Sequence, residues 1–422
     1  MIYRVSKLHH PIIEEIEIPP DKSISHRALI LGSMGKGETV IHNLLESKDV
    51  LSTVRILKKL GVKIQREKNL WKVKNTIGFK EPLEILNAGN SGTTARLMMG
   101  VLSSLPFISF LTGDKSLRRR PMDRVIIPLS QMGAEFWAKS GKFLPLAIKG
   151  APLKPIHYTL PIPSAQVKSA IILAALRASG ETTIREPLPS RDHTERMVKH
   201  MGAEIFKEEK VIKVKGSELY AREFKIPGDL SSASFFITLA LLIPGSRIVI
   251  KGVGLNPTRK GFLELLKKIG GRIEENIKEK EWEPRGDLIV EYSELKPFKI
   301  GKKEIPLLID EIPLLALIAT QIEGISEIRD AEELRVKESD RIKSTVGNLR
   351  LLGAEIEELP DGMIIKGKTI LKGNRVRSFG DHRIAMMLII AGLIAEGETI
   401  IEGAECVDIS FPGFFGKIES LF

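Results

Sequence analysis

Apolar runs of helical length recur along the chain, and each one follows a polar loop and leads into a glycine-containing turn and a β-like stretch. The six runs begin at His26, Thr93, Val167, Ser232, Ile312 and His382. Equivalent positions in successive runs are roughly 70 residues apart, which indicates an internal repeat. Because each run is apolar nearly all round, we expect these helices to be buried on several sides.

A second helix follows the first in each repeat, and its pattern is amphipathic. In the first repeat, Val50, Val54, Leu57 and Leu60 recur at helical spacing and form one apolar face. Five of these helices end at a large apolar residue followed by glycine, the usual C-cap signal. The pairs are Leu60-Gly61, Met132-Gly133, Met201-Gly202, Ile269-Gly270 and Leu352-Gly353. Strand-like segments follow, so the pattern predicts an α/β fold of six βαβαββ-like repeats with helices packed on sheets.

Six such repeats are too many for one core of ordinary size, so we expect two lobes of three repeats each. Lobe II is predicted to span residues 19–226. Lobe I is predicted to be discontinuous and to combine an N-terminal strand in residues 1–18 with repeats four to six in residues 227–422. The chain would then cross between the lobes near Pro19 and near Pro227, and two crossovers form a hinge. A cleft that closes between the lobes is the expected ligand site.

Composition narrows the possible functions. The single cysteine, Cys406, excludes a disulfide framework and a cysteine-based zinc site, and no cluster with metal-ligand spacing occurs, so we expect neither a metal nor a cofactor. Apolar stretches reach only about 14 residues and no leader-like segment opens the chain, so we expect a cytoplasmic protein without a membrane span. The net charge of +11 fits small anionic ligands or a solvated basic surface. Aromatic residues, at 5%, offer little for stacking on nucleic-acid bases, so no nucleic acid is expected.

The polar loops hold the candidate functional residues. In DKSISHR, Lys22, Ser23 and Arg27 surround a helix N-terminus, where free N–H groups and the helix dipole favour an anion. The alternative is that Asp21 or Ser23 is only a helix cap, with Lys22 in solvent. In GNSGTTAR, Gly92 permits a ligand to approach the backbone closely, or it belongs only to a turn with a threonine cap.

Three consecutive arginines, 118–120, stand before Pro121. A run of charges is usually solvated, so we expect the first two in solvent. The residue before a proline is held extended, which makes Arg120 the best ligand-binding candidate of the three.

The third repeat carries a smaller set of polar side chains. Its candidates are Ser164, Gln166, Lys168 and Ser190. Asp192 and Thr194 belong either to the same binding edge or to a helix cap.

The second half of the chain contains three charged loops. The segment LLIDEIP, residues 307–313, is expected to follow an apolar strand, with Asp310 and Glu311 directly before a buried helix, where an acid is either a cap or a general base. In RVKESDR, Lys337 and Arg341 are four residues apart and share a face if the segment is helical, and the alternative is an exposed salt-bridged turn. The His-Arg pair at 382–383 begins the sixth apolar helix, an arrangement that an anionic ligand explains better than stability does.

Six helix N-termini, three from each lobe, would converge on one cleft in this arrangement. The cations they bring are Lys22, Arg27, Arg120, Lys337, Arg341 and Arg383. So many cations in a small volume create a strongly positive potential, which suits substrates with several phosphate or carboxylate charges.

In this order, the loops resemble the signatures of the 5-enolpyruvylshikimate-3-phosphate synthase family, and the resemblance spans essentially the whole chain. RVKESDR and GDHR are the most specific of its motifs. The resemblance implies two similar inside-out α/β lobes, each built from three copies of one unit. It also implies a shikimate-pathway reaction that leads to chorismate and the aromatic amino acids. In that reaction the enolpyruvyl group of phosphoenolpyruvate passes to the 5-hydroxyl of shikimate 3-phosphate, and phosphate is released. The expected enzyme is a monomer whose partners are these small molecules.

The resemblance also assigns residues to each substrate. Shikimate 3-phosphate would be held by Lys22, Ser23, Arg27, Ser164, Gln166, Ser190, Asp310 and Lys337. Phosphoenolpyruvate would be held by Lys22, Gly92, Arg120, Gln166, Arg341 and Arg383. Asp310 would accept the proton of the attacking hydroxyl, and either Glu338 or Lys22 would supply a proton to C3. The arginines would neutralise the carboxylate and the phosphate and stabilise the charged intermediate.

Two positions depart from the family pattern. Ile409 stands where many relatives carry lysine, which leaves Lys417 as a candidate replacement, and Glu333 occupies an asparagine-like binding position. There are two alternatives to this family. A UDP-N-acetylglucosamine enolpyruvyl transferase usually has a catalytic cysteine in its first lobe, whereas Cys406 lies in the last repeat. A basic repeat protein that binds RNA ends is the other alternative, and RNA binding at moderate salt would distinguish it.

Overall fold

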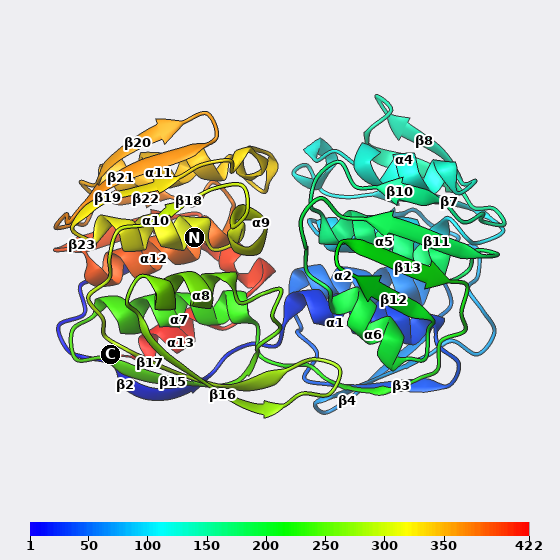
Figure 1. Ribbon diagram of the computed structural model, residues 1–422, viewed down its shortest axis with the longest axis horizontal. Helices are drawn as coiled ribbons and strands as arrows, with labels where there is room; N and C mark the ends of the chain where they lie inside the picture. Colours follow the sequence, from blue (N-terminus) through cyan, green and yellow to red (C-terminus); the bar gives the residue numbers. More distant parts are fainter. Residues whose placement is uncertain (422) are drawn as a thin grey trace. The chain divides into compact units, whose positions relative to one another are not determined.

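The computed structural model describes residues 1–421 (Figure 1). The chain forms two compact units: unit 1 comprises Met1–Pro19 and Pro227–Phe422, and unit 2 comprises Pro20–Ile226. Six small sheets alternate with helices along the chain, so the predicted α/β architecture of six repeats is confirmed. Within residues 1–421, no helix combines the length and the apolarity needed to cross a membrane.

Two repeats of unit 2 show the βαβαββ order in full. The second repeat contains β6 (Leu86–Asn87), α3 (Gly92–Leu102), β7 (Ile108–Thr112), the 3-10 turn η1 (Leu117–Arg119), α4 (Asp123–Gln131), β8 (Glu135–Lys139) and β9 (Phe143–Lys149). The third contains β10 (His157–Thr159), α5 (Ala165–Ala175), β11 (Glu181–Arg185), α6 (His193–His200), β12 (Ile205–Glu208) and β13 (Val211–Lys215). In both, the first strand pairs in parallel with the second, and a hairpin of the last two strands completes a four-stranded sheet.

The first and fourth repeats exchange their leading strands. The first contains α1 (Lys22–Met34), β3 (Glu38–His42), α2 (Lys48–Lys59), β4 (Lys63–Glu67) and β5 (Leu70–Lys74). The fourth contains α7 (Leu230–Leu242), β15 (Arg247–Gly254), α8 (Gly261–Lys268), β16 (Arg272–Glu279) and β17 (Arg285–Glu291). The strand β2 (Ile13–Glu17) precedes α1 but pairs with β15, whereas β14 (Glu223–Lys225) precedes α7 but pairs with β3. Each of these two sheets therefore takes its outer parallel strand from a segment beside a boundary between the units.

The last two repeats of unit 1 are less regular. The fifth contains β18 (Lys299–Ile300), α9 (Ile305–Leu308), α10 (Ile312–Thr320), β19 (Gly324–Ile328), the 3-10 helix η2 (Glu332–Val336), α11 (Arg341–Leu351), β20 (Glu355–Leu359) and β21 (Gly362–Gly367). The sixth contains β22 (Arg375–Arg377), α12 (His382–Ile394), β23 (Glu398–Glu402), η3 (Ala404–Ile409) and α13 (Phe414–Glu419). The first strand of the chain, β1 (Ile2–Ser6), pairs antiparallel with β23 and completes the sheet of the sixth repeat.

The segment before Asp310 differs from the prediction. We expected an apolar strand there, but residues Ile305–Leu308 form the short helix α9, so that prediction is wrong. Pro306 lies in the first turn of this helix, where its fixed φ favours helical geometry and its missing N–H costs nothing.

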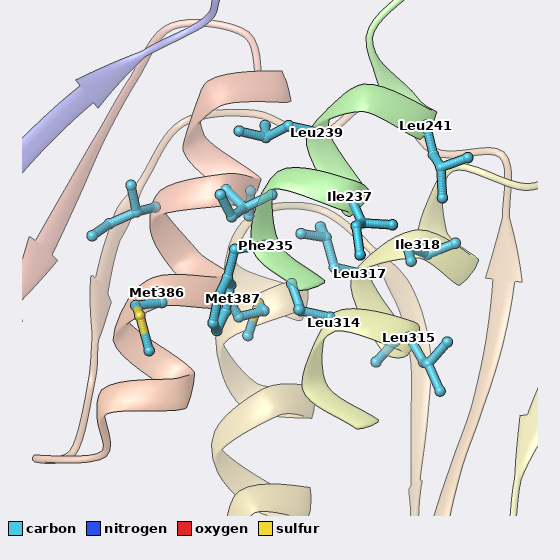
Figure 2. Packing of buried hydrophobic residues seen from close by; sticks show 14 of the residues in the cluster. Phe235, Ile237, Leu239, Leu241, Leu314, Leu315, Leu317, Ile318, Met386 and Met387 are labelled. Carbon is cyan, nitrogen blue, oxygen red and sulfur yellow. The ribbon is translucent and has the colours of Figure 1, made fainter. Parts of the chain in front are cut away.

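The first helices of the repeats form the centre of each unit. In unit 1, α7, α10 and α12 contact one another, and Phe235, Leu314 and Met387 belong to a single buried cluster (Figure 2). Every residue of α7 from Leu230 to Leu241 is buried. In unit 2, α3 contacts both α1 and α5. The predicted burial of these helices on several sides is therefore confirmed.

Glycine ends five of the second helices, as predicted. Gly61, Gly133, Gly202, Gly270 and Gly353 have φ values between 87° and 114°. Only glycine adopts this left-handed conformation without steric cost, and it lets the chain turn from the helix into the hairpin that follows.

Candidate active site

The predicted site residues are divided between the two units, and in unit 2 the first group surrounds the start of α1. Asp21 caps this helix, because its Oδ1 accepts a hydrogen bond from the Ile24 N–H at 2.8 Å. The side chain of Lys22 is 19% exposed, and its Nζ lies 3.4 Å from Asp49 Oδ2. The cap predicted for Asp21 is confirmed, but Lys22 is held by an acid of α2 rather than lying in open solvent.

Arg27 extends from α1 into the buried interior of unit 2. Its Nε donates to Thr194 Oγ1 at 2.7 Å, its Nη2 to Ser169 Oγ at 2.9 Å, and its Nη1 to the Ser23 carbonyl at 2.9 Å. The neighbouring His26 is buried, and burial together with the adjacent cations holds its pKa well below the usual value. This imidazole is therefore neutral, and it adds no charge to the N-terminal end of α1.

Gln166 is fixed by residues of α3. Arg96 Nη1 donates to Gln166 Oε1 at 2.8 Å, and Gln166 Nε2 donates to Thr93 Oγ1 at 3.0 Å. Arg96 Nη2 also donates to the Pro121 carbonyl at 3.0 Å. The neighbouring Ser164 caps α5, where its Oγ accepts from the backbone at 3.4 Å. Sequence reasoning did not select Arg96 as a site residue, although Arg27 and Arg96 occupy equivalent positions in the first and second repeats, roughly 70 residues apart.

Arg120 behaves as its position before a proline predicts. Its backbone is extended, with φ −85° and ψ 133°, while Arg118 and Arg119 are exposed. Arg120 Nη2 donates to Asn90 Oδ1 at 2.8 Å and to Ser116 Oγ at 3.2 Å, which directs the guanidinium toward the loop before α3. The different environments of the three arginines are therefore confirmed.

Gly92 is the first residue of α3 and faces two of these guanidinium groups. A Cβ atom at this position would lie 2.9 Å from Arg96 Nη1 and 3.5 Å from Arg120 Nη1. The φ of Gly92 is not in the left-handed region, so backbone strain does not require glycine here. The predicted threonine cap is wrong, because Ser91 caps the helix through its Oγ at 3.0 Å.

The family resemblance of the loops implies that Gly92 lines a phosphoenolpyruvate site, and on that basis Gly92→Ala is expected to raise the KM for phosphoenolpyruvate. The new methyl group displaces only the end of the Arg96 side chain and approaches Arg120, but it occupies space that a ligand at this backbone would need. The expected loss of roughly 1–3 kcal/mol therefore falls on ligand binding and corresponds to an increase in KM of about 5- to 150-fold. Because the backbone is unstrained, the melting temperature should change little. Steady-state kinetics and thermal unfolding on one preparation test both expectations, and a lower melting temperature with an unchanged KM would contradict them.

Ser190 belongs to a buried ionic cluster in unit 2. Its Oγ donates to Glu186 Oε1 at 2.5 Å. The Nζ of Lys168 lies 3.0 Å from the Glu186 carboxylate and 2.7 Å from Glu195 Oε1, and all three charged side chains are almost fully buried. Burial disfavours the charge on Lys168, but Glu195 and Glu186 more than offset it and raise the pKa of this lysine. Lys168 therefore holds Glu186 in place, and Glu186 fixes the hydroxyl of Ser190.

The polar residues that follow Ser190 do not act as caps. Asp192 precedes α6 without capping it, and its Oδ1 instead accepts from Arg196 Nε at 2.9 Å. Thr194 lies within α6 and shares a hydrogen bond with Ser169 at 2.7 Å. The cap hypothesis is therefore wrong for both residues, and Thr194 serves to hold Arg27.

In unit 1 the second group centres on Asp310, just before α10. Arg341 Nη1 lies 3.4 Å from Asp310 Oδ1, and Arg383 Nη2 lies 3.4 Å from Asp310 Oδ2. Arg383 Nη1 also donates to the Asp310 carbonyl at 3.1 Å. One carboxylate thus stands between two guanidinium groups that come from the N-termini of α11 and α12.

Arg341 has two further acidic partners. Its Nε donates to Asp381 Oδ2 at 2.8 Å, and its Nη2 donates to Glu338 Oε2 at 2.6 Å. Burial disfavours the charge on this guanidinium, but Asp381, Glu338 and Asp310 more than offset that cost and raise its pKa. Arg341 is therefore charged and fixed in direction, as binding of an anion requires.

Lys337 does not share a helical face with Arg341. Its backbone is extended at the end of η2, with φ −81° and ψ −154°, and α11 begins only at Arg341. The prediction of a common helix is wrong because Asp340 caps α11, with its Oδ1 accepting from Lys343 N at 3.0 Å. The Nζ of Lys337 lies 3.7 Å from Glu333, the residue at the asparagine-like position. Burial lowers the pKa of Lys337 despite the nearby acids.

The charges at the start of α12 are partly balanced within the protein. Asp381 caps the helix by accepting from Arg383 N at 2.9 Å, and Glu311 lies 3.8 Å from Arg383. The unfavourable placement of a His-Arg pair is thus relieved by neighbouring acids, so an anion is not needed to explain it.

Ile409 packs partly against the core, and Lys417 lies on α13. Across residues 1–421, no group of three or more His, Cys, Asp or Glu side chains is arranged to hold a metal ion.

The repeats and their sheets define a known class of fold. The enolpyruvyl transferase NikO from Streptomyces tendae has a similar structure, with a TM-score of 0.80 over 100% of this chain and 97% of that protein. At 14% identity this similarity establishes the fold alone. The chain therefore has the same fold as that protein.

The family follows from closer relatives. Residues 7–418 match the family model described as EPSP synthase (3-phosphoshikimate 1-carboxyvinyltransferase). A 3-phosphoshikimate 1-carboxyvinyltransferase of Bacillus cereus (strain G9842) is 50% identical over 411 residues, which cover 96% of each chain. An EPSP synthase structure from Acinetobacter baumannii is 38% identical, with a TM-score of 0.88 over 100% of this chain and 98% of that one. The chain belongs to the EPSP synthase family, which confirms the resemblance inferred from its loops.

Proposed function

We propose that the enzyme transfers the enolpyruvyl group of phosphoenolpyruvate to the 5-hydroxyl of shikimate 3-phosphate and releases phosphate. The observation that carries this proposal is the placement of Asp310 between Arg341 and Arg383, with each guanidinium 3.4 Å from the carboxylate. A proton acceptor beside two fixed cations suits the addition of a hydroxyl to an anionic enol phosphate. Relatives that carry the name of this activity support it.

The residues of unit 1 supply the acid–base chemistry in this proposal. An uncharged hydroxyl is a poor nucleophile, so Asp310 accepts its proton as the oxygen bonds to C2 of phosphoenolpyruvate. C3 receives a proton at the same stage, from Glu338 or from Lys22 of unit 2. Loss of a proton from C3 and of phosphate from C2 then restores the double bond. Arg341 and Arg383 bind the negative groups and stabilise the charged intermediate.

The remaining assignments concern substrate binding. Shikimate 3-phosphate is held by Lys22, Ser23, Arg27, Ser164, Gln166 and Ser190 of unit 2 with Asp310 and Lys337 of unit 1. Phosphoenolpyruvate is held by Lys22, Gly92, Arg120 and Gln166 of unit 2 with Arg341 and Arg383 of unit 1. The hydrogen bonds that fix Gln166, Ser190 and Arg120 support these roles, because a binding group held in one direction loses less entropy when a ligand arrives.

A phosphate-release assay with both substrates tests the proposal. Phosphate should appear only when phosphoenolpyruvate and shikimate 3-phosphate are both present. The same assay with UDP-N-acetylglucosamine as acceptor tests the alternative transferase, and RNA binding at moderate salt tests the RNA-end hypothesis. Release with UDP-N-acetylglucosamine but not with shikimate 3-phosphate would overturn the proposal.

We also propose that the enzyme acts as a monomer in the cytoplasm and needs no nucleic acid. The low aromatic content of 5% supports the last point, since base-stacking surfaces use these side chains. Light scattering during size-exclusion chromatography would measure the oligomeric state directly, and a mass of twice 46.9 kDa would contradict a monomer.

The depressed pKa of Lys337 predicts a pH effect on substrate capture. The protonated amine binds the anionic substrate, so kcat/KM for shikimate 3-phosphate should fall as pH rises through the lowered pKa of Lys337. This fall should come below the ordinary lysine pKa of about 10.4. In Lys337→Arg the charge persists at alkaline pH, so the fall should move to higher pH. Identical profiles for the two proteins would exclude Lys337 as the titrating group.

A further inference from the structure

One buried acid next to the proposed base has no role in the reaction so far. Glu311 directly precedes α10, but its carboxylate makes no capping hydrogen bond to that helix. The residue is 5% exposed. Its Oε1 accepts a hydrogen bond from Ser231 Oγ and lies 3.8 Å from Arg383 Nη1. The carboxylate therefore contacts Ser231 on one side and, on the other, Arg383, which we propose binds phosphoenolpyruvate.

Ser231 is itself held by a buried arginine. Arg259 Nη2 donates to Ser231 Oγ at 2.6 Å and lies 3.3 Å from Asp229 Oδ1. Asp229 in turn caps α7 by accepting from Ser231 N at 2.8 Å. Arg259 is only 7% exposed, so these contacts form in a region of low dielectric constant, where charged hydrogen bonds are strong.

The chemistry of the three groups fixes the direction of each hydrogen bond. A guanidinium only donates and an ionised carboxylate only accepts, whereas a hydroxyl has one proton and two acceptor positions. Ser231 must therefore accept from Arg259 and give its single proton to Glu311. This leaves one arrangement for the hydrogen-bond chain Arg259–Ser231–Glu311. That arrangement holds the Glu311 carboxylate so that it faces Arg383.

This hydrogen-bond chain and Arg383 together join all three repeats of unit 1. Arg259 and Ser231 come from the fourth repeat, Glu311 from the fifth and Arg383 from the sixth. Arg383 consequently has one carboxylate partner, Asp310, that must accept a proton in the proposed reaction. The other partner, Glu311, is removed from the reaction by burial and by its bond to Ser231.

We propose that Glu311 is a positioning residue for phosphoenolpyruvate binding, which acts by holding Arg383 and is itself held by Ser231 and Arg259. The inference rests on the proposed function and adds to it. Without Glu311, the side chain of Arg383 has only Asp310 as its acidic partner among these contacts, so it should turn toward the base and away from the ligand. The loss should therefore appear in the binding of phosphoenolpyruvate and not in that of shikimate 3-phosphate.

Two variants test this role in the full-length enzyme. Glu311→Gln removes the charge that faces Arg383, and Ser231→Ala removes the hydroxyl that orients Glu311. Both are expected to raise the KM for phosphoenolpyruvate by roughly tenfold, the effect of losing about one ordinary hydrogen bond, with the KM for shikimate 3-phosphate within about twofold. If one variant fails to fold, as judged by thermal unfolding, the other still decides.

Asp287→Asn is the matched control, because it also removes a buried carboxylate of unit 1. Asp287 is bound by Lys251, Lys278 and the Gly252 N–H, and none of these is part of the chain that holds Glu311. The stability of the Asp287→Asn variant should fall, but its KM values for both substrates should stay within about twofold of wild type. A rise in the KM for phosphoenolpyruvate in this control would show that any buried charge matters equally and would overturn the inference.

A double-mutant cycle separates positioning from a general structural effect. If Glu311 acts through Arg383, then Glu311→Gln should have no further effect on the KM for phosphoenolpyruvate in an Arg383→Gln background, where the cation that Glu311 holds is gone. Additive effects would overturn the inference. The proposed function is judged separately by wild-type phosphate release: without release both proposals fail, whereas normal release with an unchanged KM in the variants overturns the positioning role alone.

Discussion

Asp310→Asn is expected to lower kcat by a factor of about 10² or more, while both KM values stay within a few fold of wild type. Asparagine has nearly the same shape but cannot take up a proton from the attacking hydroxyl. The flanking arginines should stay in place, because Arg341 keeps its hydrogen bonds to Asp381 and Glu338. Steady-state kinetics in both substrates measures the separation of kcat from KM.

The asparagine variant also distinguishes between the candidate acids. Turnover close to that of wild type would remove Asp310 from the role of base and would shift attention to Glu338. Glu338→Gln and Lys22→Met, assayed for exchange of solvent hydrogen into C3, would then show which of these residues relays the second proton. An unaffected exchange rate in either variant would eliminate that residue.

Lys168→Met is expected to destabilise unit 2 by about 3–5 kcal/mol. The substitution removes the cation that lies within 3.0 Å of both the Glu186 and the Glu195 carboxylates, and it leaves Glu186 only the more distant Lys207, whose Nζ is 3.9 Å away. Because the pKa of Lys168 is raised, its contribution to stability is fully present below the ordinary lysine pKa of about 10.4 and is lost only as pH rises through the raised value. The loss in the free energy of unfolding of the Lys168→Met variant should therefore be nearly constant around neutral pH.

Lys213→Met provides the matched control in the same unit. Lys213 also faces a glutamate, Glu181, but the two atoms are 3.9 Å apart and the side chains are 53% and 36% exposed. An exposed pair of this kind contributes less than about 1 kcal/mol. Denaturant unfolding measures the loss in the free energy of unfolding for both variants. Equal losses would mean that burial does not strengthen the ion pairs of Lys168.

The fold could be predicted because its signals are local and repeated. The glycine after Leu60 and its four equivalents mark helix ends through a backbone conformation that only glycine adopts freely, so the residue type reveals the structure. Pro121 distinguished Arg120 from its two neighbours for a similar reason, since proline restricts the residue before it.

The errors came from patterns that fit more than one structure. The spacing of Lys337 and Arg341 suits a helix, but Asp340 begins a new helix between them, and its capping role was the signal that was missed. The apolar residues before Asp310 suit a strand or a short helix equally, and Pro306 favours the helix. The hydrogen-bond chain Arg259–Ser231–Glu311 could not be predicted from the sequence, because these residues lie far apart along the polypeptide and meet only through packing.

The pairing of the first strand with the last constrains the order in which the protein can form. Residues 2–6 lie against residues 398–402, so the sheet of the sixth repeat stays open until the ribosome has made residue 402. Unit 2 is one continuous segment, Pro20–Ile226, and has no such delay. Because chains are made at about 5–20 residues per second, unit 2 has on the order of ten seconds to fold before unit 1 can close. During that interval the first strand has no partner, because the residues with which it pairs have not yet been made.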